Sequence, residues 1–104
     1  MPNPFDTLKQ EVPEVAAAFN GLISAISASG GLDEKTRQLI FIGIKASQGD
    51  TSAAAAHTPM AKKGGASREE VRDAVLMTLP VSGIQGITQC LAPVLDAYDR
   101  EALS

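Results

Sequence analysis

His57 is the one histidine of this 104-residue chain, and its residue type makes it the first candidate for chemistry. An imidazole titrates near neutrality, so it can accept or release a proton under physiological conditions. At helical spacing, Ala53 and Ala61 would lie one turn to either side of His57. Such small neighbours would leave a hollow beside the ring that could admit a small molecule. The alternative is a surface or interface histidine with no ligand.

Two polar residues that precede His57 are further candidates. Gln38 could orient a substrate or the imidazole, but it cannot accept a proton as a carboxylate would. Asp50 would lie on a similar helix face to His57, yet about 10 Å away along the axis, so the two cannot form a direct hydrogen bond. N-capping of a helix is the simpler role for Asp50.

Other chemistries have little support in the residue types. Cys90 is the only cysteine, so it cannot form an internal disulfide, and its apolar surroundings favour a buried inert thiol over a nucleophile. One histidine and one cysteine do not assemble a zinc site. No glycine-rich phosphate loop follows a strand. We therefore predict neither a metal nor a cofactor.

Composition limits the partners. Nine basic and twelve acidic residues give a net charge of −3, and no basic stripe indicates nucleic-acid binding. No apolar run reaches the roughly 20 residues that cross a bilayer, and the start of the chain does not resemble a signal peptide. The lone cysteine fits a reducing compartment. These features predict a cytoplasmic protein that binds neither nucleic acid nor membrane.

Capping residues place three helices between residues 32 and 80. Asp33 is a good N-cap for a helix that ends near Gln48-Gly49, and Asp50, Thr51 or Ser52 can cap the next helix. Gly64-Gly65 ends that second helix. Ser67 and Glu70 form a capping box at the start of the third.

The flanking segments also have helical patterns. The pattern of residues 1–12 indicates an N-terminal arm with an extended start and a short turn of helix. An amphipathic helix is predicted to follow, from Pro13 to about Ser29. Pro59 and Pro93 predict a kink or a restart in their helices. Strand-like alternation is absent, so residues 1–104 predict a single all-α domain of five to six helices.

The helix expected after Asp33 is apolar on more than one face, with Leu39, Ile40, Phe41, Ile42 and Ile44 in sequence. So short a chain cannot easily cover this helix with its own elements. A second copy of the chain is the natural partner, which predicts a homo-oligomer.

Around these residues the chain resembles the carboxymuconolactone decarboxylase family, which includes the alkyl hydroperoxidase D-like proteins. The resemblance covers about residues 32–90 and includes LDEKTRQLI, the histidine on an alanine-rich helix, and REEV. It implies the helical fold of that family and an oligomer, commonly a trimer of dimers, hence a hexamer. The peroxidase branch has a glutamate, two cysteines and a histidine, and these positions hold Gln38, Asp50, Ala53 and His57 here. The resemblance therefore implies catalytic roles for His57 and Gln38, and a substrate-binding role for Asp50 and Ala53.

Three functions compete. The first is a cofactor-independent lyase of the carboxymuconolactone decarboxylase type, in which His57 is a general acid or base on a small carbonyl or lactone substrate. The second is a small-molecule-binding or scaffold oligomer without catalysis. The third is an alkyl hydroperoxidase-type peroxidase that uses Cys90 between subunits, which the missing dithiol disfavours because that chemistry needs an attacking and a resolving thiol.

Overall fold

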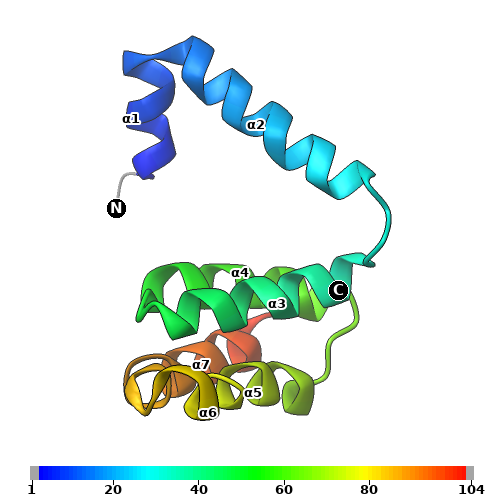
Figure 1. Cartoon of the computed structure of the whole chain (residues 1–104), viewed down its shortest axis with the longest axis vertical. Helices are drawn as coiled ribbons and strands as arrows, with labels where there is room; N and C mark the ends of the chain where they lie inside the picture. Colours follow the sequence, from blue (N-terminus) through cyan, green and yellow to red (C-terminus); the bar gives the residue numbers. More distant parts are fainter. Residues whose placement is uncertain (1–2, 103–104) are drawn as a thin grey trace. The chain divides into compact units, whose positions relative to one another are not determined.

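All regular elements that the computed structural model describes, in residues 3–102, are helical (Figure 1). Within this range six α-helices have eight or more residues, α6 is a single turn, and a π-helical segment precedes α7. The all-α prediction of five to six helices is confirmed. The elements are α1 (Pro4–Glu11), α2 (Pro13–Ala28), α3 (Glu34–Ser47), α4 (Thr51–Lys63), α5 (Arg68–Leu76), α6 (Leu79–Ser82), the π-helix (Ile87–Leu91) and α7 (Ala92–Arg100).

The chain divides into two compact units, Met1–Gly31 and Leu32–Ser104, and each is described by itself. In the first unit, α1 and α2 form a helical hairpin in which the rings of Phe5 and Phe19 stack at 5.5 Å. Part of the arm prediction is wrong, because Pro4 is the first residue of an eight-residue helix rather than part of an extended start. Proline fits this position, where its missing N–H would have no helical partner. Pro2 lies outside the described residues, and the single domain stays a prediction.

The second unit begins with an antiparallel pair, α3 and α4, which lie side by side in Figure 1. The Asp33 side chain accepts from the Thr36 N–H at 2.7 Å, so the predicted N-cap of α3 is confirmed. The turn between the helices depends on Gly49, whose φ of 73° lies in the left-handed region that favours glycine. Of the three candidate caps for α4, the structure uses Asp50.

Helix α5 begins with the predicted capping box, in which the Ser67 and Glu70 side chains each accept from the other's backbone N–H. Near Pro93 the pattern of helical hydrogen bonds changes, since the π-helix ends at Leu91 and α7 begins at Ala92, but the backbone stays helical without a restart. Helix α4 also continues past Pro59 without a restart.

The core of the second unit lies among α3, α4, α5, the π-helix and α7. It is built of four alanines, three valines, one isoleucine and one cysteine, so the helices approach closely without aromatic side chains at the centre. No helix in residues 3–102 is both long and apolar enough to cross a membrane. The buried residues are Ile42, Ala46, Ala54, Ala61, Ala66, Val71, Val75, Cys90 and Val94.

Candidate functional site

The pairing of α3 with α4 brings His57 and Gln38 into direct contact. The His57 Nδ1 atom lies 2.8 Å from the Gln38 Oε1 atom, and both residues are half-buried. One helical turn earlier, the Gln38 Nε2 atom donates to the Glu34 carboxylate, also at 2.8 Å. Three side chains thus form a continuous hydrogen-bonded row that crosses from α3 to α4.

The ring of Phe41 covers one face of the His57 imidazole. The two ring centroids are 3.6 Å apart and the planes are inclined by 22°, which is a stacked arrangement. The hollow expected from Ala53 and Ala61 is therefore not left open on this face. Ala61 is fully buried in the core and Ala53 is half-buried. The stack fixes the plane of the imidazole, while the hydrogen bond to the Gln38 amide oxygen fixes its rotation within that plane.

The environment lowers the pKa of His57 below its ordinary value of 6.5. Burial is the main cause because it disfavours the imidazolium, and the positive charge of Lys45 adds to it. The negative charge of Glu34 acts in the opposite direction. At neutral pH the imidazole is therefore uncharged and able to accept a proton.

The Glu34 carboxylate is held from two sides. Besides the bond from Gln38, it forms an ion pair with the Arg37 guanidinium at 3.1 Å. These hydrogen bonds lower the pKa of Glu34 below its ordinary value of 4.5, the bond from Gln38 being the larger cause. Glu34 is thus a carboxylate, which can only accept hydrogen bonds, at neutral pH.

The structure gives Asp50 and Ala53 a shared local role. The Asp50 side chain accepts from the Ala53 backbone N–H at 3.1 Å, which caps α4. A carboxylate oxygen of Asp50 also lies 3.7 Å from the Lys45 ammonium. Asp50 therefore contacts Lys45, the cation that lowers the imidazole pKa. The assignment of Asp50 and Ala53 to substrate binding stays a prediction.

Cys90 lies in the π-helix with no exposed surface. Its sulfur is 3.5 Å from the Thr51 hydroxyl, which also donates to the Gln89 carbonyl. The predicted buried thiol is confirmed. In residues 3–102 no group of three or more histidine, cysteine, aspartate or glutamate side chains could hold a metal ion.

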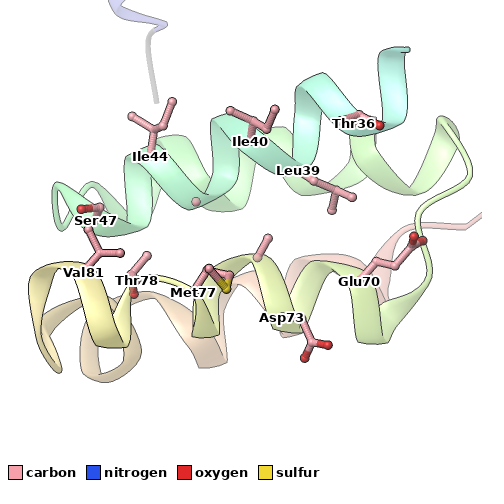
Figure 2. Close-up of a pocket in the computed structure, with 12 residues that line it drawn as sticks. Thr36, Leu39, Ile40, Ile44, Ser47, Glu70, Asp73, Met77, Thr78 and Val81 are labelled. Carbon is pink, nitrogen blue, oxygen red and sulfur yellow. The ribbon is translucent and has the colours of Figure 1, made fainter. Parts of the chain in front are cut away.

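A separate apolar groove of about 660 Å³ lies along α3, α5 and α6 (Figure 2). Its floor is tight, because a Cβ added to Gly43 would be 3.3 Å from the Ala74 carbonyl oxygen. Large apolar side chains remain exposed along it, including Ile44 at 53%, Met77 at 65% and Val81 at 76%. The lining residues are Thr36, Leu39, Ile40, Gly43, Ile44, Ser47, Glu70, Asp73, Ala74, Met77, Thr78 and Val81.

His57 does not line this groove. The residues of α3 on the side of His57 are Glu34, Gln38, Phe41 and Lys45. Those that line the groove include Thr36, Ile40, Gly43 and Ser47. At 3.6 residues per turn these two sets lie on opposite sides of the helix. A second, more polar groove of about 440 Å³ between α4 and α7 is lined by Pro59 and Arg100, and it does not include His57 either.

Sequence reasoning missed three features of this site. One is the hydrogen bond between Glu34 and Gln38, although their spacing is the i, i+4 spacing at which helical side chains meet. Sequence reasoning did not pair Phe41 with His57, because that contact depends on the register of α3 against α4. The groove also depends on tertiary packing and had no local signal beyond the apolar run on α3.

Comparisons with known proteins agree with this fold. The model of the carboxymuconolactone decarboxylase family matches residues 13–96, a wider match than the predicted 32–90. An uncharacterized protein of Cupriavidus necator is 26% identical over 82 residues, which are 79% of this chain and 73% of that protein. A crystal structure from Burkholderia xenovorans, assigned provisionally as a carboxymuconolactone decarboxylase, has a TM-score of 0.85 and 20% identity. The match covers 95% of this chain and 77% of that one, and at this identity it shows the fold alone.

Proposed function

The chain belongs to the carboxymuconolactone decarboxylase family, and from this membership we propose that it is a cofactor-independent lyase acting on a small carbonyl or lactone substrate. His57 is the general base of the proposed reaction, and Gln38 is the residue that orients it. The hydrogen bond between the His57 Nδ1 atom and Gln38 is the observation that carries the proposal. It leaves Nε2 as the ring atom that can exchange a proton with a substrate.

The electrostatics support a base rather than an acid in the first step. A lowered pKa keeps the His57 imidazole neutral at pH 7, so its free nitrogen has a lone pair. The proposed base accepts a proton from a carbon next to the substrate carbonyl. The bond from the adjacent carbon to its leaving group then breaks, the electron pair goes to the leaving group, and His57 delivers the proton to that group. Asp50 and Ala53, at the start of the same helix, form the proposed substrate-binding side of the site.

A homo-oligomer, such as a trimer of dimers, is part of the same proposal. The apolar groove along α3, α5 and α6 supports it, because exposed isoleucine, methionine and valine side chains form one continuous surface there. A second copy of the chain is the proposed partner for this surface. The proposed location is the cytoplasm, with which a single buried cysteine is compatible.

Substitution of His57 tests the catalytic role. His57→Gln keeps a polar side chain but removes the titrating nitrogen, so turnover of the best substrate in a panel of lactones and keto acids should fall by a factor of about 100 or more. Lys63→Gln is the matched control, because Lys63 is an exposed cation of the same helix. Unchanged turnover in His57→Gln would overturn the catalytic role of His57.

A binding or scaffold protein without catalysis is the second candidate, and the Phe41 ring stacked on His57 is the observation that favours it. This alternative predicts that the wild-type protein turns over no member of the panel. Binding of the same compounds, measured by calorimetry, would then persist without product formation.

The peroxidase alternative has less support, since Cys90 is fully buried and the described residues contain no second thiol. If Cys90 were the peroxidatic residue, Cys90→Ser would abolish the consumption of organic hydroperoxides. We expect no difference between that variant and the wild type.

A further inference from the structure

In the row of hydrogen bonds from Glu34 through Gln38 to His57, only one assignment of donors and acceptors is consistent. The Glu34 carboxylate can only accept, so the Gln38 Nε2 atom must be the donor of the 2.8 Å bond between them. The Gln38 Oε1 atom then faces His57 and can only accept. The proton of the bond between Gln38 and His57 therefore belongs to the imidazole, on Nδ1.

We propose that Glu34 is a positioning residue: its carboxylate fixes the orientation of the Gln38 amide, which holds the proton of neutral His57 on Nδ1 and leaves Nε2 as the proton acceptor. An amide alone could not make this choice, because either of its ends can face the imidazole after a rotation of about 180°. The fixed charge at the far end of the row removes that freedom.

The surroundings of Glu34 fit this role. Arg37 holds the second carboxylate oxygen at 3.1 Å and also donates to the Leu32 carbonyl at 2.7 Å, so the carboxylate is anchored to the start of α3. On the other side of the row, the Phe41 ring limits the rotation of the imidazole. Both ends of the row are therefore held, and the orientation of the amide between them is set by charge.

A simpler role for Glu34 is stabilisation of the α3 dipole, since it lies in the first turn. The two roles make different predictions. A dipole partner changes the stability of the helix and leaves the tautomer of His57 as it was. A positioning residue changes the tautomer, and with it the nitrogen on which the proposed lyase chemistry depends.

Nitrogen NMR of the imidazole separates these roles. The chain has a single histidine, so the protein prepared without a histidine tag gives one unambiguous pair of ring ¹⁵N signals. Above the pKa of His57, the wild type should show the Nδ1–H tautomer alone. Glu34→Gln should show a mixture of both tautomers. Glu69→Gln is the matched control, because it removes an exposed first-turn carboxylate from α5 and should leave the Nδ1–H tautomer intact.

A double variant tests whether Glu34 acts through Gln38. Gln38→Met removes the amide at similar volume, and it should produce a mixture of tautomers even with Glu34 present. Adding Glu34→Gln to that background should change the tautomer populations no further. Retention of the single Nδ1–H form in Glu34→Gln, or an Nε2–H form in the wild type, would overturn the proposal.

The catalytic meaning of this inference rests on the proposed function, but the NMR measurement needs no substrate. In Glu34→Gln, kcat should fall in proportion to the Nδ1–H population, while KM stays the same. Loss of the tautomer with an unchanged kcat would overturn the positioning role. If instead the wild type turns over no lactone or keto acid, the proposed function fails, while the tautomer measurement still decides the structural role of Glu34.

Discussion

Helix α3 has two opposite faces that differ in chemistry. The face toward α4 holds Glu34, Gln38 and Phe41, and its polar side chains are joined by hydrogen bonds to one another and to His57. The opposite face holds Ile40 and Ile44, two groove residues that are about half exposed and whose side chains point away from α5 and α6 in Figure 2.

This difference separates two tasks on one helix. On the face with His57, each polar group of the row is held by a hydrogen bond to its neighbour. This arrangement suits a site that must keep one geometry. The groove face is open and apolar, which suits association with another apolar surface. Substitutions on one face should therefore leave the properties of the other unchanged.

The largest expected effect is a loss of stability on substitution of Ile42, which lies on α3 between the two faces. Ile42 has no exposed surface, so Ile42→Ala should lower the free energy of unfolding by about 2 to 5 kcal/mol through lost burial and a residual cavity. Ile44→Ala makes the same change on the groove face, where 53% of the side chain is exposed, and should cost about 1 kcal/mol or less. Urea denaturation at low protein concentration measures both. Equal costs would show that the groove is covered even in a dilute sample.

A charge in the groove should have the next largest effect. Ile44→Lys would place an unpaired ammonium in the proposed contact between copies, which costs about 3 kcal/mol or more, or roughly a hundredfold in the dissociation constant. Light scattering over a range of concentrations should show a smaller species than the wild type, whereas Ile44→Leu should behave as the wild type. The His57 pKa should not change in either variant. An unchanged oligomer in Ile44→Lys would mean that copies associate elsewhere.

A change on the opposite face should act on His57 instead. Gln38→Glu places a carboxylate beside Nδ1, and a close opposite charge should raise the pKa of His57 by about 1 to 3 units. The introduced group would also lie beside Glu34 with no amide donor between the two carboxylates, which costs stability. Titration of the single histidine by NMR measures the shift, with exposed Gln85→Glu as a control of equal charge. No upward shift would contradict the contact between residues 38 and 57.

The sequence predicted the parts of the fold that depend on neighbouring residues. Asp33, Asp50 and Ser67 cap their helices because a short polar side chain reaches the backbone N–H three residues ahead. The π-helix and the division of the chain into two units had no comparable signal, because both depend on packing between distant segments.

The site was predicted only in part, for the same reason. The resemblance indicated His57 and Gln38, and the structure places these two side chains in contact. It also indicated Asp50 as a substrate-binding residue, which stays a prediction, while the capping bond from the Ala53 N–H to Asp50 is the role that residue type had predicted. The direction of the hydrogen bonds from Glu34 needs the distance between two helices, which residue types alone do not give.

The smallest expected effect is a pH dependence of the free energy of unfolding that arises from the titration of His57. In residues 3–102 the charged groups that act on the pKa of His57 are Lys45 and Glu34, both on α3, and the net direction is downward from 6.5. Between the folded pKa and 6.5, the unfolded chain therefore binds more protons than the folded one, so the free energy of unfolding rises with pH in this window. Stability should accordingly fall as the pH drops below 6.5.

Carboxylates contribute a separate loss at lower pH, because the pKa of Glu34 and that of Glu70 lie below their ordinary value of 4.5 in the folded state. Chemical denaturation at a series of pH values should thus show two steps in the wild type. In His57→Gln only the step below 4.5 should remain, while Ile44→Leu on the groove face should keep both. A wild-type stability that rises as the pH falls through 6.5 would mean that the attraction of Glu34 for the imidazolium exceeds the combined effect of burial and Lys45.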